Sequence, residues 1–356
     1  MFKSKYFKTL STVIALTFVL SGCGNTNKNQ INKQNEQPPN QTKVEQGTSY
    51  YYTANEGGSI SKIDSKTNKV LETIKVDGAP HNVQVSPDGK IAAATSAVMM
   101  EKGKTEHGTM SMNGSALFYD VETNKLIKKI EVGKHPAHIV FTSDGKYSLV
   151  TNNEDNNVSV IDMKDYNVVG KISTGNGPHG FRISKDNKFA YVANMDEDTI
   201  SVLDITNFKE VKKIKVGRTP VTTGITSDGK TLLATVNSEN ALAIIDLSTD
   251  RVEKIPVGVG PAQVYIQSDN KFAFVANQGT EDKPSNTVSK IDLVTKEVVA
   301  TIETGKGAHG VVTSADNKFI YVTNMYDNTV SVIDNTSNKV IATVAVDKTP
   351  NGISYR

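Results

Sequence analysis

Short apolar runs alternate with polar positions along most of the chain, which is the pattern of short, partly buried β-strands. Residues 179–216 show four such strands in succession: HGFRIS, KFAYVAN, TISVLD and EVKKIKV. Between the first and second strands of each unit lies an Asp-Gly or Asp-Asn pair, whose residues tolerate positive φ and predict a hairpin turn. These pairs occupy 88–89, 144–145, 186–187, 228–229, 269–270 and 316–317.

The four-strand unit recurs along the chain. The turn before each unit falls at Pro80, Pro136, Pro178, Pro220, Pro261, Ala308 and Pro350, at intervals of 56, 42, 42, 41, 47 and 42 residues. A period near 42 with four strands per unit is typical of a β-propeller blade.

The two ends of the repeat region complement each other. Residues 51–76 contain the last three strands of a unit but no first strand, and the C-terminal TPNGISYR supplies one. We therefore predict that residues 50–356 form an all-β, seven-bladed β-propeller with four antiparallel strands per blade. Pairing of residues 351–355 with the N-terminal blade closes the ring and removes an open sheet edge.

The first residues differ from the rest. A basic start with Lys3, Lys5 and Lys8 precedes the apolar segment TLSTVIALTFVL, which is too short to span a bilayer and ends in LSGC at 20–23. This resembles a bacterial lipoprotein signal, and the resemblance implies removal of residues 1–22 and acylation of Cys23. The alternative is an uncleaved membrane anchor. We expect an exported protein held by lipid on the outer face of the bacterial cell membrane.

Residues 23–49 follow the signal segment, begin with the lipid-bearing cysteine and are rich in Asn and Gln, with few large aliphatic side chains. Such a composition cannot bury enough apolar surface to fold, so we predict a disordered tether. Loss of residues 1–22 removes three lysines and no acidic residue, which leaves 37 basic against 38 acidic residues. This balance, without a basic stripe, argues against nucleic acid as a partner.

The second strands carry a recognisable motif: YVAN (191–194), FVAN (274–277) and YVTN (321–324). With these motifs the repeats resemble the YVTN, or surface-layer-like, β-propeller family. The resemblance implies the fold but not the activity, because that family includes cell-surface proteins and lies near lactonase-like and haem-binding propellers. GNGPHG and GKGAHG match a dinucleotide-binding pattern, but each joins two strands rather than a strand and a helix.

The candidate site residues are predicted to lie on one face of the propeller. It receives the turns before the first strands and the residues after the YVTN strands, together with insertions at 97–114 and 278–286. His81, His179 and His309 share one repeat position, and His135 and His138 flank the turn of blade three. The other predicted residues of this ligand-binding face are His107, Met99, Met100, Met110, Met112, Met195, Met325, Asn194 and Asn324.

Three interpretations of these histidines stay open. They are a repeat consensus that satisfies backbone groups, or a site for copper or another transition metal, or part of an enzyme. For the metal site we predict the ligands His81, His179, His309, His138, Met110 and Met112, since imidazole and thioether suit copper. Nitrous-oxide reductase offers an analogy, although this chain lacks its complete histidine ring. No cofactor is required by the sequence.

These patterns lead to one functional expectation with one alternative. We expect a monomeric, envelope-anchored binding module whose partners are the membrane, through lipid on Cys23, and an envelope protein, polymer or small ligand. The alternative is a lactonase- or lyase-like enzyme. In it an axial histidine acts as general base, and a metal or Arg182 polarises a carbonyl.

Overall fold

The computed structural model describes residues 49–98 and 112–356. The predicted signal segment, Cys23 and almost all of the tether lie outside the described residues, as do Met99, Met100, His107 and Met110. Within the described ranges, no helix has the length and apolar character needed to cross a membrane.

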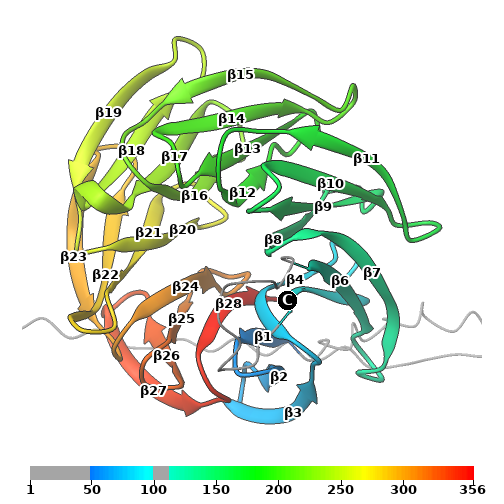
Figure 1. Cartoon of the computed structure of the whole chain (residues 1–356). Coiled ribbons are helices and arrows are strands. Elements are labelled where there is room, and N and C mark those ends of the chain that lie inside the picture. Colours follow the sequence, from blue (N-terminus) through cyan, green and yellow to red (C-terminus); the bar gives the residue numbers. More distant parts are fainter. Residues whose placement is uncertain (1–48, 99–111) are drawn as a thin grey trace, which may run out of the picture. The chain divides into compact units, whose positions relative to one another are not determined.

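Seven antiparallel sheets of four strands each surround a central axis, as predicted (Figure 1). The innermost strands are β28 (Pro350–Tyr355), β4 (Ala79–Val85), β8 (Pro136–Phe141), β12 (Pro178–Ile183), β16 (Pro220–Ile225), β20 (Pro261–Ile266) and β24 (Ala308–Thr313). The second strands are β1 (Tyr50–Asn55), β5 (Ile91–Ala97), β9 (Tyr147–Asn152), β13 (Phe189–Asn194), β17 (Thr231–Val236), β21 (Phe272–Gly279) and β25 (Phe319–Asn324).

The third strands are β2 (Ser59–Asp64), β6 (Asn113–Asp120), β10 (Asn157–Asp162), β14 (Thr199–Asp204), β18 (Ala241–Asp246), β22 (Pro284–Asp292) and β26 (Thr329–Asp334). The outer strands are β3 (Lys69–Lys75), β7 (Leu126–Lys134), β11 (Asn167–Ser173), β15 (Lys209–Lys215), β19 (Arg251–Pro256), β23 (Glu297–Glu303) and β27 (Lys339–Ala345). A 3-10 turn, η1 (Asn237–Glu239), is the single helical element of the described chain.

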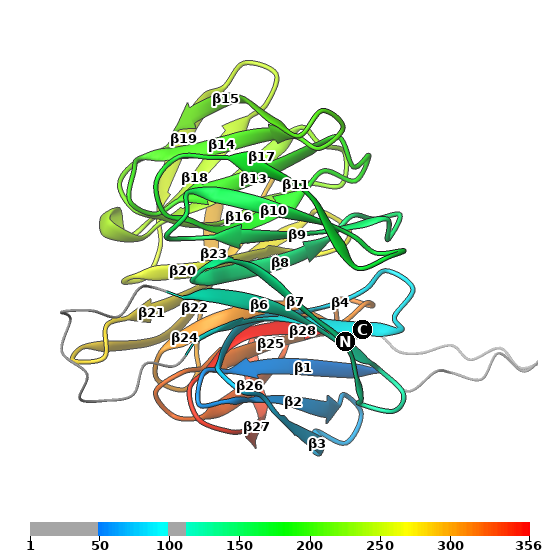
Figure 2. The same cartoon turned by 45° about the vertical axis from the view of Figure 1, so that its right-hand side comes forward.

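The ring closes between the two ends of the repeat region, as predicted. Strand β28 pairs antiparallel with β1, with Tyr355 opposite Tyr51 and Ile353 opposite Thr53, so blade one combines both ends of the propeller (Figures 1 and 2). The Tyr321 ring of blade seven lies 4.5 Å from the Tyr51 ring and 5.5 Å from the Tyr355 ring, between centroids. The closing blade is therefore packed as a normal member of the ring.

Burial explains why the second and third strands of each blade differ in sequence from the outer strand. The second and third strands are covered on both faces by neighbouring blades and are almost continuously buried, as in FAYVAN of β13, whereas KEVKKIK of β15 is mostly exposed. Apolar side chains from adjacent blades form the core clusters between sheets; one joins Val192 of blade four to Leu149 of blade three. The predicted hairpin turns are also confirmed, because Gly89 and Asn187 both have positive φ.

Candidate functional site

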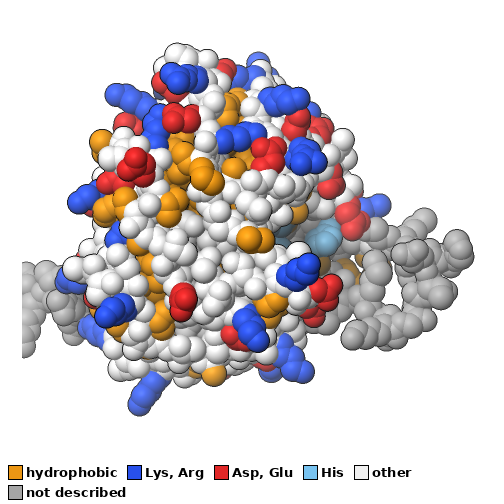
Figure 3. Space-filling view, turned by 90° about the vertical axis from the view of Figure 1, so that its left-hand side faces the viewer, with side chains coloured by type: hydrophobic (Ala, Val, Ile, Leu, Met, Phe, Trp, Pro, Cys, Tyr) orange, Lys and Arg blue, Asp and Glu red, His pale blue; other side chains and the backbone are white. Residues whose placement is uncertain are grey.

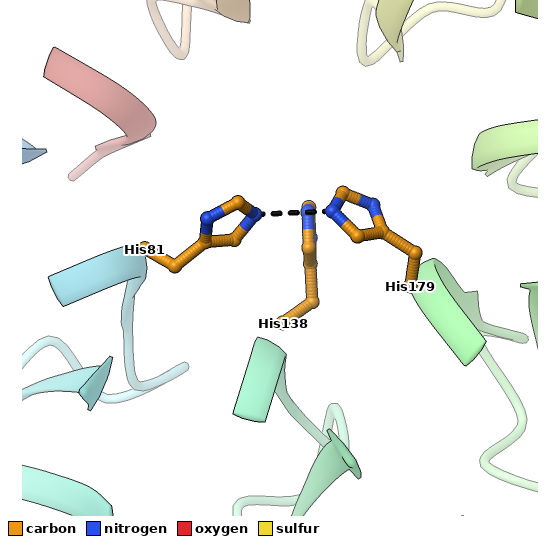
Figure 4. A group of neighbouring side chains, drawn as sticks. All are labelled: His81, His138 and His179. Carbon is orange, nitrogen blue, oxygen red and sulfur yellow. Dashed lines mark hydrogen bonds between the residues drawn. The ribbon is translucent and has the colours of Figure 1, made fainter. Parts of the chain in front are cut away.

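Four of the five described histidines lie on innermost strands, close to the strand starts. His81 is on β4, His138 on β8, His179 on β12 and His309 on β24. The rings of His81, His138 and His179 point toward one another from three consecutive blades (Figure 4). One ring nitrogen from each of these three lies within 4.8 Å of the other two. We call this group the axial histidine cluster.

The closest contact in the cluster joins two imidazole nitrogens. Nε2 of His81 lies 3.1 Å from Nε2 of His179. On the far side of its ring, His81 Nδ1 is 2.7 Å from Oε1 of Glu56, in the loop after β1. On the other ring, His179 Nδ1 is 3.1 Å from the backbone oxygen of Val221.

These partners define the tautomers of the two rings. A carboxylate and a carbonyl only accept hydrogen bonds, so both Nδ1 atoms carry the proton when the rings are neutral. Each Nε2 then presents a lone pair, and the two lone pairs face each other across 3.1 Å. A proton or a cation between the nitrogens would remove this conflict. Hydrogen bonding of the remote ring nitrogen to a carboxylate or carbonyl is also how metal-ligating histidines are usually oriented.

His138 completes the cluster from the third blade. It is 1% exposed, and neither ring nitrogen has a hydrogen-bond partner within the described chain. Its ring centroid lies 5.0 Å from that of His179 and 5.9 Å from that of His81. A buried imidazole with two unpaired nitrogens carries a desolvation cost that a ligand in the cluster would offset.

Threonine hydroxyls fix the backbone that carries these rings. Thr151 of β9 accepts a hydrogen bond from the backbone N–H of His138 at 2.9 Å and donates one to the backbone oxygen of His179 at 2.8 Å. The Thr151 side chain therefore fixes the position of β8 relative to β12, the strands that carry His138 and His179. Thr95 of β5 and Thr323 of β25 make equivalent links between other blades.

Electrostatics keep the buried rings neutral. Burial, reinforced by the neighbouring histidines, holds the pKa values of His138 and His179 well below the usual 6.5. Burial lowers the pKa of His309 to about 4. For Glu56, burial opposes ionisation, but hydrogen bonds from His81 and Asn351 and the nearby imidazoles outweigh it, so its pKa is lowered. His138 and His179 thus offer unprotonated nitrogens, and an ionised carboxylate lies behind His81, which is the state that metal binding requires.

Of the four predicted histidine ligands, the structure brings His81, His138 and His179 together. The fourth, His309, is outside this group, with its ring 6.4 Å from the His81 ring. His135 points elsewhere: its side chain is 52% exposed, and its Nδ1 lies 3.4 Å from Glu154.

The described methionines that were predicted to lie on the ligand-binding face are exposed or partly buried. Met112 is 63% exposed. Met195 and Met325 follow their strands at partly buried positions, and the sulfur of Met325 accepts a hydrogen bond from Gln278 at 3.2 Å. The three side chains that the structure brings together as candidate ligands are all histidines.

Asn194 and Asn324 have a structural role instead of lining a ligand-binding face. Both are 0% exposed. The Asn194 amide donates to Thr199 at 3.0 Å and to Ser201 at 2.9 Å within its own blade, and Asn324 makes the same pair of bonds in blade seven. The prediction that they contact ligand is wrong, because the end of the YVTN motif turns inward to bind the third strand.

Glu56 and Asn351 belong to the site but were not predicted. The Asn351 amide donates to Glu56 Oε1 at 2.8 Å, and the same carboxylate oxygen contacts His81. A signal was available: Asn351 occupies the repeat position of His179 and His309, and Glu56 occupies that of Met195 and Met325. The closing blade thus supplies a carboxylate and an amide where other blades supply histidine and methionine.

A family model matches most of the chain. The YNCE-like beta-propeller model matches residues 109–285 and 268–355. The chain belongs to the YNCE-like beta-propeller family. This YNCE-like propeller matches no protein of curated function.

Solved structures support the same architecture. A structure titled Kuenenia stuttgartiensis hydrazine synthase is 23% identical to this YNCE-like propeller, with a TM-score of 0.66 over 77% of this chain and 89% of that one. A functionally unknown protein from Desulfotomaculum acetoxidans is 14% identical, with a TM-score of 0.72 over 86% of this chain and 98% of that one. At these identities the likeness establishes the fold alone.

Proposed function

We propose that this YNCE-like propeller is an envelope-anchored binding module that holds one transition metal ion at the axial histidine cluster. One observation carries the proposal: the Nε2 atoms of His81 and His179 are 3.1 Å apart, while the closest partners of their Nδ1 atoms are acceptors, the Glu56 carboxylate at 2.7 Å and the Val221 carbonyl at 3.1 Å. A metal ion between these nitrogens would convert two opposed lone pairs into two coordinate bonds. His138, buried and unpaired, would be the third ligand.

The dimensions and chemistry suit a small divalent or monovalent transition metal. Zinc–nitrogen bonds are about 2.0–2.1 Å, which puts two ligand nitrogens on one ion slightly more than 3 Å apart. The His81–His179 separation of 3.1 Å already fits, and His138 lies within the 4.8 Å limit of the group. Three imidazoles with Glu56 behind one of them suit zinc or copper. We therefore propose zinc or copper as the ion.

The cellular setting of this module is part of the proposal. Acylation of Cys23 would attach the chain to the outer face of the membrane, and the Asn/Gln-rich residues 24–48 would separate the propeller from the lipid. The face drawn in Figure 3 carries interspersed acidic and basic side chains and lacks a large patch of either sign. This distribution favours a small ligand or envelope component over a polyanion as partner.

Elemental analysis of protein purified without an affinity tag tests the metal proposal. Protein from cells grown with zinc and copper should contain about one equivalent of one of these metals, after removal of loosely bound ions by gel filtration. A His81→Ala/His138→Ala/His179→Ala variant should contain less than about a tenth of that amount. The His135→Ala variant is the matched control and should match the wild type. Equal metal content in the triple variant and the wild type would refute the proposal.

A hydrolytic function is a second candidate, because three imidazoles on one metal leave a position for water, as in catalytic zinc sites. The axial cluster has this composition. A panel of lactones assayed with the zinc-loaded protein distinguishes the candidates. An enzyme would show turnover that disappears in His138→Ala, whereas a binding module would show none.

A further inference from the structure

Arg182 lies farther along its inner strand than the histidines and has no ion pair with any residue that the structure describes. Arg182 is on β12, three residues beyond His179, which corresponds to about 10 Å along an extended strand. Arg182 is partly exposed, and its partial burial lowers the pKa of the guanidinium group. Its one hydrogen bond to a described residue runs from Nη1 to the backbone oxygen of Phe181, at 2.8 Å.

The neighbours of Arg182 give it no carboxylate. Within residues 49–98 and 112–356, no Asp or Glu forms an ion pair with it. The two charge-bearing or polar groups that interact with it electrostatically are His138, which its own environment keeps neutral, and the Tyr265 hydroxyl. A guanidinium has five N–H donors, so most of the hydrogen-bonding capacity of Arg182 is unused by the described protein.

The repeat explains how Arg182 and Tyr265 come together. Both occupy the same position of the inner strand, opposite Tyr191 of β13 and Phe274 of β21 respectively. In the intervening blade five this position is Gly224, opposite Leu233, and side chains of Ile266 and Val264 from blade six lie against it. The Tyr265 hydroxyl also hydrogen-bonds with Thr313 of the next blade, which orients it. Arginine and tyrosine thus lie at the same level of the ring, on blades four and six, and their polar groups interact electrostatically.

A partly buried cation loses part of its hydration, and its N–H donors need other partners. Proteins offset this cost with a carboxylate or with a bound anion, and the planar guanidinium fork matches the two oxygens of a carboxylate or phosphate. We propose that Arg182 and Tyr265 form a binding site for a small oxyanion, a carboxylate or inorganic phosphate, inside the ring. The site uses none of the cluster ligands and does not depend on the metal proposal.

Thermal unfolding in matched salts tests the oxyanion site. The full mature chain is melted in sodium acetate, sodium phosphate and sodium chloride at equal ionic strength, over a concentration series. At saturation, acetate or phosphate should raise the wild-type Tm by about 3–6 °C above chloride, with a hyperbolic dependence on concentration. The salt that acts at the lower concentration identifies the source as carboxylate or phosphate.

Two arginine variants test whether Arg182 binds the anion. Arg182→Gln removes the cation and should lose the Tm rise, whereas Arg218→Gln changes an exposed arginine and should keep it. If Arg182→Gln fails to fold, Tyr265→Phe, which removes one hydroxyl, should shift the midpoint concentration of the Tm rise upward at least about fivefold. An equal salt response in Arg182→Gln and the wild type, an unchanged midpoint in Tyr265→Phe, or no saturable rise in the wild type would overturn the proposal.

Discussion

Nε2 of His81 and Nε2 of His179 lie 3.1 Å apart although their strands belong to blades two and four. The two residues are 98 positions apart in the sequence, and blade three contributes His138 between them. Each remote nitrogen is held by an acceptor, Glu56 Oε1 or the Val221 carbonyl. The propeller thus brings imidazole nitrogens from three blades together on its axis, where a proton or a metal ion between the two Nε2 atoms would satisfy both.

Stability of the metal-free protein should fall as the pH drops below 6.5. The folded state holds the pKa of His309 at about 4, so below 6.5 the unfolded chain binds a proton that the folded chain does not. By this residue alone, the free energy of unfolding should decrease by about 2–3 kcal/mol between pH 7.5 and 4.5. Denaturant unfolding at several pH values, with a chelator present, measures this decrease in the free energy of unfolding. His309→Gln should lose that part of the pH dependence and the exposed His135→Gln should not; an unchanged dependence in His309→Gln would contradict the assignment.

Deletion of residues 349–356 should destabilise the whole propeller. The deletion removes β28, exposes the edge of β1 and takes away Ile353, which is 5% exposed. Truncation of a buried isoleucine alone costs about 2–5 kcal/mol, so we expect a loss of at least about 3 kcal/mol, with aggregation on heating. Calorimetry and size-exclusion chromatography measure both effects. Deletion of the equally long segment 24–31 is the control. A monomer with unchanged Tm would contradict the closure.

Asn194→Ala should weaken the fold without affecting ligand binding. The change removes two hydrogen bonds, from the Asn194 amide to the Thr199 and Ser201 hydroxyls, which hold the end of β13 against β14. We expect a decrease of about 1–3 kcal/mol in the free energy of unfolding. Asn176→Ala, at an exposed position, should change it by less than about 0.5 kcal/mol. If urea unfolding gives equal values for both variants, or if Asn194→Ala reduces metal binding, the structural role is wrong.

Cys23→Ser should release the protein from the membrane. Serine cannot form the thioether that carries the lipid, and without multiple acyl chains attachment is not durable. Fractionation of cells, followed by mass spectrometry of the propeller, measures location and processing. Ser21→Ala keeps the cysteine and a small side chain two positions before it, and serves as the control. A Cys23→Ser protein that stays in the membrane fraction with unchanged mature mass would show that this residue is not the anchor.

The sequence was sufficient for the architecture because each blade repeats the same strand pattern. The predicted markers are strand boundaries: β12 starts at Pro178, β13 ends at Asn194 and β14 ends at Asp204. When one unit leaves a strand boundary ambiguous, the same boundary can be recognised in the other units of the repeat. Ring closure followed from the same logic, since one unit lacked its first strand and another segment supplied it.

All three histidines of the cluster were among the predicted ligands, but the sequence could not separate His309 from them. Each inner strand begins with an irregular register, as between Pro136 and Ile139 on β8. At such an irregularity the alternation of side chains breaks, so His138 reaches the cluster although it lies one repeat position after His179. Glu56 and Asn351 were missed for another reason: they are 295 residues apart and meet only because the ring closes.

Metal titration of His138→Ala tests the central claim most directly, because this side chain makes no hydrogen bond within the described chain that its loss could break. Calorimetric titration at pH 7.5 with Zn²⁺ and with copper compares the wild type, His138→Ala and the exposed control His135→Ala. We predict one ion per wild-type chain with a Kd of about 1 μM or below, the same affinity in His135→Ala, and affinity at least about tenfold weaker in His138→Ala. Equal affinity of the wild type and His138→Ala for both metals, or wild-type binding weaker than about 10 μM, would contradict a metal site at the axial histidine cluster.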